Sequence, residues 1–410
     1  MTPAELSRTV LRTVRRAVEA GELRAPVPAR VVVRRPPRPG CGDYATNVAL
    51  QLAPHAGRPP RQVAEILRAR IQETAGVARV EIAEPGFLNI TLERGGHSAV
   101  VQDVLAAGSF YGHRQGYAYG SEHQDPDQDP DQDISAPAAV ELRFAPDIRA
   151  ALTADALARI LRTQGATDVR LLCGGEPDPL WVHALGINTR EINAREISAL
   201  RGAPAASAGR IRPVPAPHPA AELLRTLGPD ATRWALLRPA AHDHPRTDPA
   251  GLLAQRESNP LFRVQYAHAR ACASLRNAAD LGITPDPSAT DPASGDPAHS
   301  DAAHRDAAHG DPAAPPVGPT PDGAHPAALL AEYPGVLASA ARLRAPDRLA
   351  RHLEATADAF LRHQAHHPVL PRGDEKPEAA HRARAALAQA AGTVLAGGLH
   401  LLGITAPAHL

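Results

Sequence analysis

The sequence predicts a multi-domain protein in which a small N-terminal α/β domain and a reduced Rossmann-like βαβ unit precede a C-terminal helical bundle. Three patterns predict this fold class. An amphipathic helical pattern alternates with short apolar strands over the first 92 residues, a strand–helix–strand pattern lies between Val140 and Leu172, and helical patterns dominate after Ala220. A chain of 410 residues is long enough for several domains, each with its own core.

The N-terminal α/β domain is expected to span residues 1–115. Its first helix follows from the recurrence of Leu6, Val10 and Val14 on one helical face. The turn residues Glu84-Pro85-Gly86 separate two short apolar runs, which is typical of a hairpin. The expected elements are a helix over 3–19, a strand over 30–35, a helix over 60–74, and strands over 80–82 and 87–92.

Two polar segments divide the remainder of the chain. Residues 116–139 are expected to be a linker, because the run QDPDQDPDQD within it is acidic and broken by proline. Residues 140–219 hold the βαβ unit, whose helix is expected over 153–164. The helical domain spans 220–410 and is interrupted at 284–325 by a loop whose five-residue repeats offer only Ala and Pro to a core. Its helices are expected over 220–238, 249–280, 327–342, 346–365 and 375–402.

The charge distribution, the cysteines and the apolar runs of the chain limit which functions are expected. Net charge is zero, but residues 1–40 hold nine Arg against three Glu, and a local basic face is enough for RNA binding. Lys376 is the only lysine, and the three cysteines are scattered. No disulfide framework, zinc site or other metal site is therefore expected. No apolar run of spanning length occurs, so we expect a cytoplasmic protein without a membrane segment.

Both ends of the chain carry motifs of one family. Asn259-Pro260, the run VQYAHAR at 264–270 and the run LLGITAP at 401–407 resemble the DALR-type anticodon-binding domain of arginyl-tRNA synthetases. The run GDYATN at 42–47 and the run PGFLN at 85–89 resemble the N-terminal tRNA-binding domain of the same class I family. The resemblance covers about residues 3–92 and 220–410, apart from the repeat loop.

The resemblance implies a tRNA-binding surface at each end. Over 258–278 the apolar positions, Tyr266 among them, are expected to form a core-facing stripe, and Gln265, His268 and Arg270 a polar face. Taken alone, such a polar face is more often a solvated helix face, but the resemblance implies that Tyr266 can stack an unpaired base and that Arg270 can bind base edges or phosphates. In the N-terminal motif Asn47 is as good a candidate for a helix cap as for an RNA contact. The residues implied to bind tRNA are Tyr44, Asn47, Asn259, Gln265, Tyr266, His268 and Arg270.

The middle of the chain lacks the catalytic signatures of the family. Between Leu142 and Ala154 the family has a loop with an H-x-G-H signature (HIGH), whereas residues 143–153 contain neither His nor Gly. The lysine-rich KMSKS loop should precede the bundle, but residues 203–219 offer only Arg210 and Arg212, and arginine does not replace a mobile phosphate-binding lysine. We therefore predict no catalytic residues in this shortened paralogue.

These observations leave three functions open. The first is a catalytically degenerate protein, a pseudoenzyme, that binds a tRNA which we expect to be an arginine acceptor and needs no cofactor. The second is a divergent arginine–tRNA ligase, which alone would require ATP. The third is an accessory protein whose βαβ remnant pairs with a protein partner that uses tRNA. The missing phosphate-binding residues favour the first function.

Overall fold

The computed structural model divides the chain into two compact units. One comprises residues 1–100 and 287–332, and the other comprises 101–286 and 333–410. The structure describes residues 3–34, 36, 42–92, 95–114, 139–187, 190–191, 207–291 and 325–410. The linker predicted over 116–139 lies outside these ranges except for Ala139, and so does most of the repeat loop, from residue 292 to 324.

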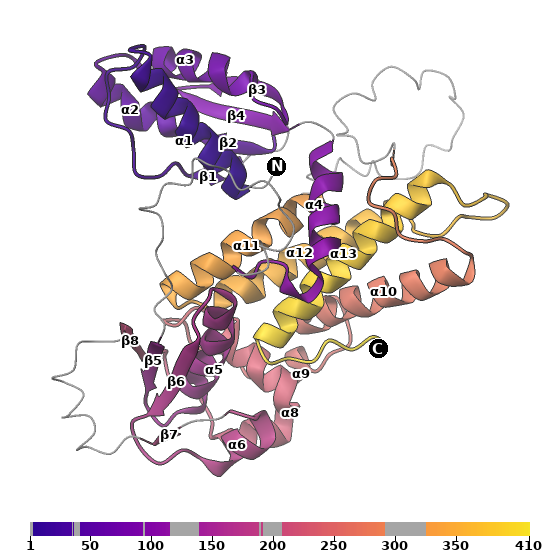
Figure 1. Ribbon diagram of the computed structural model, residues 1–410. Coiled ribbons are helices and arrows are strands. Elements are labelled where there is room, and N and C mark those ends of the chain that lie inside the picture. The colour runs from indigo at the N-terminus through magenta and orange to yellow at the C-terminus, as the bar shows by residue number, and fades with distance from the viewer. Residues whose placement is uncertain are drawn as a thin grey trace, which may run out of the picture. The chain divides into compact units, whose positions relative to one another are not determined.

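The N-terminal unit contains the predicted small α/β domain, with three helices packed against an antiparallel sheet of strand order β1-β2-β4-β3 (Figure 1). Leu6, Val10 and Val14 are fully buried, which confirms the apolar face predicted for the first helix. The elements are α1 (Pro3–Glu19), β1 (Val33–Arg34), β2 (Tyr44–Thr46), α2 (Val48–Ala56), α3 (Pro60–Gln72), β3 (Val77–Ala83) and β4 (Phe87–Leu92).

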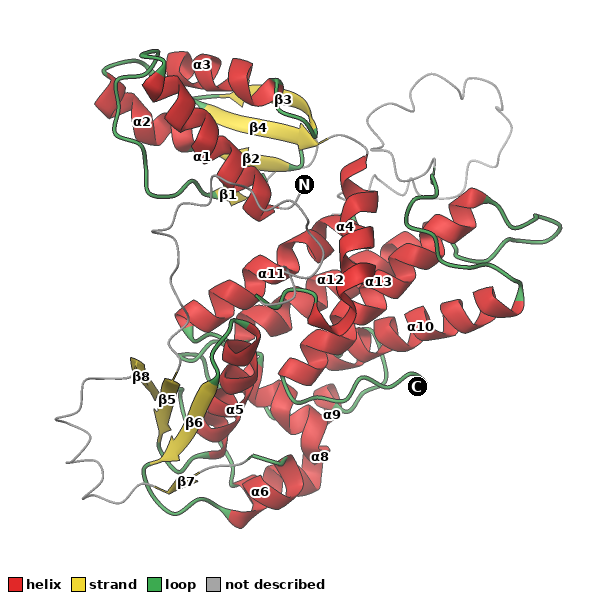
Figure 2. Ribbon diagram, viewed as in Figure 1, coloured by secondary structure: helices red, strands yellow, loops and turns green. Residues whose placement is uncertain are grey.

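The second unit begins with a parallel sheet of strand order β7-β6-β5-β8 (Figure 2). The prediction of a single βαβ unit was too small, because β7 and β8 extend the sheet on both sides. The sequence did not show them because β7 is two residues long and β8 follows a stretch rich in Ala, Gly and Pro. The elements are β5 (Ala139–Phe144), α5 (Ile148–Thr163), β6 (Asp168–Cys173), α6 (Pro179–Leu185), β7 (Arg190–Glu191) and β8 (Ser207–Ile211).

The helices after the sheet form a bundle in which α10, α12 and α13 pack against one another. The helix predicted over 249–280 is wrong in one respect, because a non-helical segment separates α9 from α10 and Asn259 caps the second helix. The remaining helices are α4 (Gly95–Ala107), η1 (Gly108–Phe110), α8 (Ala220–Leu237), α9 (Pro249–Leu252), α10 (Pro260–Asp280), α11 (Pro326–Leu343), α12 (Asp347–His366) and α13 (Ala379–Leu401).

Two further boundaries differ from prediction for local reasons. Helix α5 begins at Ile148 rather than at Thr153, because the Asp147 carboxylate accepts hydrogen bonds from the first free backbone N–H groups. Strand β1 covers only two of the six residues predicted over 30–35, and residue 35 lies outside the described ranges. Over the described ranges, no helix is both long and apolar enough to cross a membrane.

Candidate nucleic-acid interface

Helix α10 carries a surface of the bundle that combines aromatic and polar side chains. Its start is fixed by Asn259, whose Oδ1 accepts a hydrogen bond from the Leu261 N–H at 3.1 Å, and by Pro260 in the first helical turn. Leu261, Val264 and Ala267 are buried and hold the helix against the bundle. The residues between these apolar positions therefore face outward at helical spacing.

Phe262 and Tyr266, together with Arg270 one turn further along α10, form a row that we call the aromatic–arginine ridge. The Phe262 and Tyr266 rings stack with centroids 5.7 Å apart and planes at 15°, and Tyr266 is 37% exposed. The Arg270 side chain donates through Nε to Gln364 Oε1 on α12 at 2.9 Å and through Nη1 to the Tyr266 hydroxyl at 3.4 Å. The ridge thus offers an aromatic face and a positioned guanidinium one helical turn apart.

Gln265 and His268 lie on a different side of α10 and hold the C-terminal segment. The Gln265 amide donates to the Thr405 carbonyl at 3.1 Å, and His268 Nδ1 lies 2.9 Å from the Pro407 carbonyl oxygen. His268 is 8% exposed, and this burial lowers the pKa of its imidazole. The structure therefore does not place these two residues with Tyr266 and Arg270.

Asn259 is also engaged inside the protein. It is 3% exposed, and its Nδ2 donates to the carbonyl oxygens of Leu252 at 2.7 Å and Ala254 at 3.0 Å. Together with the cap to Leu261, these bonds use both donor hydrogens and one acceptor site of the amide. The arrangement identifies a structural role for Asn259, while its predicted RNA contact stays a prediction.

In the N-terminal unit the two predicted residues also differ in exposure. Tyr44 is 3% exposed within the hydrophobic core, on the strand β2. Asn47 stands at the N-cap position of α2 without a capping side-chain bond, and its Oδ1 accepts instead from the Gln51 amide at 3.2 Å. Asn47 is half-buried and accessible to a partner, whereas the Tyr44 ring is covered by its own domain.

The carboxyl ends of β5 and β6 are where ligands bind in open α/β sheets. A pocket of about 440 Å³ lies there, beside the start of α5. Its lining includes the carboxylates Asp147, Glu176 and Asp178, and none of its lining residues is Lys or Arg. Asp147 Oδ1 accepts from the N–H groups of Arg149 and Ala150, and its Oδ2 accepts from Ala216 N–H at 3.2 Å. The helix N-terminus is thus already neutralised by a carboxylate of the chain itself.

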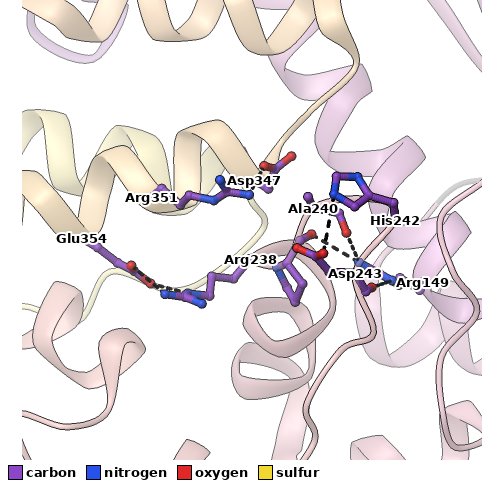
Figure 3. Close-up of polar contacts among 9 residues, drawn as sticks. Arg149, Arg238, Ala240, His242, Asp243, Asp347, Arg351 and Glu354 are labelled. Atoms are coloured by element: carbon purple, nitrogen blue, oxygen red, sulfur yellow. Dashed lines mark hydrogen bonds and ion pairs between the residues drawn. The ribbon is translucent and has the colours of Figure 1, made fainter.

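Arg149, in the first turn of α5, does not line this pocket, and its guanidinium lies among backbone carbonyl groups (Figure 3). It is 1% exposed, and burial lowers the pKa of its guanidinium, against the opposing effect of Asp147, Asp243 and Asp347. Its five hydrogen bonds reach the carbonyl oxygens of Leu236 (3.0 Å), Val214 (2.8 Å), Asp243 (2.8 Å), Pro239 (3.2 Å) and Ala240 (2.9 Å). Every N–H of the guanidinium is used in this way.

The same region holds further charged contacts between and within helices. Arg238 at the end of α8 forms a bidentate pair with Glu354 on α12, and Arg351 pairs with Asp347 one turn away on α12 (Figure 3). Deeper inside, Arg233 Nη1 pairs with Asp155 of α5 at 2.9 Å. Reasoning from the sequence missed Arg149, Arg233 and Asp155 as structural groups, since charged residues are rarely fully buried and no pattern marks these three.

No group of three His, Cys, Asp or Glu suited to a metal ion occurs in the part of the chain that the structure describes. The pair His242 and Asp243 lies in a loop, where it is one part of the contacts around Arg149 (Figure 3).

Comparisons with known proteins match family domains at both ends of the chain. Residues 5–92 match the family described as arginyl tRNA synthetase N terminal domain, and residues 321–410 match the DALR anticodon binding domain. The arginine–tRNA ligase of Renibacterium salmoninarum is 29% identical over 582 aligned positions that cover all of both chains.

Two solved structures share the fold. The arginyl-tRNA synthetase of Thermus thermophilus aligns over all of both chains with a TM-score of 0.55 at 16% identity. That of Plasmodium falciparum aligns over all of this chain and 99% of its own, with a TM-score of 0.67 at 9% identity.

The fold and these matches define first a class, that of aminoacyl-tRNA synthetase-like proteins with an anticodon-binding helical domain. Within it, the chain is an arginyl-tRNA synthetase-related protein that carries the N-terminal domain of that family and a DALR domain.

Proposed function

We propose that this protein binds tRNA, with the aromatic–arginine ridge of α10 as its contact to an unpaired loop, and that it does not carry out aminoacylation. The observation that carries the binding proposal is the exposed Tyr266 ring, stacked on the half-buried Phe262, beside the exposed Arg270. Single-stranded loops present splayed bases that stack on aromatic rings and on guanidinium planes, so the ridge has the chemistry that such a loop requires.

The loss of catalysis is supported by the start of α5. Adenylate chemistry on a sheet of this type needs donors for triphosphate charge at a helix N-terminus, together with mobile cationic side chains. Here Asp147 already occupies the backbone donors, and Arg149 is fixed among carbonyl groups. A carboxylate at that position repels phosphate, so this turn does not fit ATP.

The lengths of the alignments support the same proposal. The alignments with the arginine–tRNA ligases of Renibacterium salmoninarum and Frankia alni span 582 and 578 positions, whereas this chain has 410 residues. Gaps in this chain therefore account for well over a hundred aligned positions, which is consistent with a catalytic region much shorter than theirs.

A second candidate function is arginine–tRNA ligation by a divergent site. It rests on the curated relatives, which carry the name arginine–tRNA ligase and align with the chain over its full length. The two functions separate in one assay, arginine-dependent pyrophosphate exchange with tRNA present. Exchange above the background of a tRNA-free control would overturn the proposal of lost catalysis and leave the binding proposal standing.

The binding proposal predicts that Tyr266→Ala weakens tRNA binding by roughly 1–3 kcal/mol, because a stacked base loses its aromatic support. Filter binding at fixed moderate salt measures the change. Tyr266→Phe retains the ring and should bind nearly as well as the wild type.

The matched control is Phe110→Ala, which removes an aromatic ring that is 63% exposed on η1, outside the ridge. Equal losses in the Tyr266 and Phe110 variants would contradict a specific role for the ridge. Equal weak affinity of the wild type for tRNA and for unrelated RNA would contradict the proposed specificity.

A further inference from the structure

Gln364 on α12 is a buried amide at the contact with α10. The residue is 6% exposed, and both polar atoms of its side chain are bonded to residues of α10. The amide oxygen Oε1 accepts from Arg270 Nε at 2.9 Å, and Nε2 donates to the Ser274 hydroxyl. A guanidinium can only donate hydrogen bonds, so the oxygen must face Arg270, and the Ser274 bond holds the amide in this orientation.

The guanidinium of Arg270 is held at two nitrogens and is accessible at the third. Nη1 donates to the Tyr266 hydroxyl at 3.4 Å, whereas Nη2 has no partner among the residues that the structure describes, and Arg270 is exposed. The bonds to Gln364 and Tyr266 use two of the five N–H groups of a guanidinium. The remaining N–H groups can only donate, so a ligand must supply an acceptor, such as a phosphate oxygen or the O6 and N7 atoms of guanine.

Gln364 provides the firmer of the two bonds that hold Arg270 in the free protein. Its bond is 2.9 Å long against 3.4 Å for the bond to Tyr266, and it comes from a buried residue of a second helix. A long, flexible side chain that becomes ordered only on binding weakens the interaction by about two- to tenfold. A guanidinium that is already ordered avoids this loss.

We propose that Gln364 is a positioning residue of the aromatic–arginine ridge, which holds the Arg270 guanidinium beside Tyr266 ready for an acceptor group of the bound loop. This inference rests on the proposed tRNA binding and adds to it a residue that does not itself contact RNA. The alternative is that Gln364 only holds α12 against α10, so that its effect on binding follows from stability alone. The two roles differ in whether the effect of Gln364 depends on Arg270.

The test is a double-mutant cycle with Gln364→Met and Arg270→Met, in which the unbranched methionine fills space but makes none of these hydrogen bonds. Filter binding of an arginine tRNA transcript at fixed moderate salt gives the affinity of each protein. We expect Gln364→Met to bind about two- to tenfold more weakly than the wild type, because Arg270 is then ordered only on binding. In the Arg270→Met background the same substitution should change the affinity by less than about twofold, because no guanidinium is left to position.

The matched control is Thr356→Val, which removes a different buried polar group from α12. Thr356 is fully buried, and its hydroxyl donates to the His352 carbonyl of the same helix at 2.8 Å. This variant should bind the transcript like the wild type, and thermal unfolding shows whether each variant is folded. A loss from Gln364→Met by the same factor in both backgrounds, or an equal loss in Thr356→Val, overturns the positioning role and leaves tRNA binding standing.

The same proteins measured over a salt series show which group of the RNA meets Arg270. If the acceptor is a phosphate, Arg270→Met lowers the slope of log affinity against log salt by about 1, and an unchanged slope assigns the acceptor to a base edge. Either result supports a positioned guanidinium when the cycle is non-additive. A wild type that does not bind the transcript overturns the proposed function, whereas binding with additive effects overturns only the role of Gln364.

Discussion

At the scale of single residues, several polar side chains that could serve a ligand are used to hold the protein together. His268 connects α10 to the C-terminal segment through Pro407, and its Nε2 lies 3.5 Å from the Cys272 sulfur. Burial disfavours the charged form of the imidazole more than the Pro407 carbonyl favours it, so the pKa of His268 lies below its ordinary value. The C-terminal segment is thus attached by a histidine that is neutral at physiological pH.

This state predicts a pH dependence of stability. Above about pH 6.5, the ordinary pKa of histidine, His268 is neutral in the folded and the unfolded chain. As the pH falls below that value, the unfolded chain takes up a proton that the folded chain does not, so the free energy of unfolding decreases. Urea unfolding between pH 8 and pH 5 measures the slope. A His268→Gln variant should show a smaller decrease than the wild type, and an identical profile would contradict the assignment.

At the scale of elements, α10 is the helix on which stability and binding meet. Its cap fixes where the helix begins, and the start determines which side chains form the ridge. The side chain of Asn259 caps the helix and also donates hydrogen bonds to the carbonyl groups of Leu252 and Ala254 in the segment that leads from α9 to α10. The sequence run around Asn259 and Pro260 is therefore needed for the geometry of Tyr266 and Arg270, although it lies at the buried end of the helix.

Replacing Asn259 by alanine is expected to lower the free energy of unfolding by about 1–3 kcal/mol, because the variant loses a helix cap and leaves two partly buried carbonyl groups without donors. Chemical denaturation measures this change. Asp248→Ala removes the exposed cap of the four-residue helix α9 and serves as the control. The Asp248→Ala control should lower the free energy of unfolding clearly less than Asn259→Ala. An equal decrease would show that the burial of the Asn259 hydrogen bonds is unimportant.

At the scale of the molecule, the α/β layer and the helical bundle belong to one compact unit. Arg233 on α8 is 2% exposed and reaches Asp155 of α5, the Leu185 carbonyl at 2.7 Å and the Leu402 carbonyl at 3.2 Å. Arg159 of α5 also donates to the His400 carbonyl, near the end of α13. The layer is therefore part of the support of the C-terminal segment.

Arg233→Met is expected to destabilise this unit by about 3–5 kcal/mol, because it leaves the carboxylate of Asp155 with only the partly exposed Arg159 as a partner. A second substitution, Asp155→Leu, should recover much of that loss, since an apolar pair of similar volume avoids the buried charge. Unfolding monitored by far-UV circular dichroism measures both variants. Recovery would not be observed if Arg233 acted only through the carbonyl groups of Leu185 and Leu402.

The sequence by itself determined the classes of the elements and the family. Hydrophobic periodicity predicted α1, α3, the β3–β4 hairpin and most helices of the bundle, because each buries one regular face. The runs at both ends indicated the two arginyl-tRNA synthetase-related domains, for which residues 5–92 and 321–410 give matches. The sequence also placed Arg270 on the polar face of this helix, because spacing from the apolar positions is a local property of the helix. The same pattern counted Tyr266 among the core-facing positions, whereas its ring is 37% exposed.

Only the tertiary structure decided which polar residues face outward and which are enclosed. Gln265 and His268 share the predicted polar face with Arg270, but their partners lie in the C-terminal segment, and the partners of Asn259 lie in the loop after α9. The hydrogen bonds of Arg149 to backbone carbonyl groups and the Arg233–Asp155 pair join residues more than 60 positions apart in the sequence. Such contacts are set by the packing of distant elements, which no local pattern encodes, so the division between structural and accessible polar groups required the folded chain.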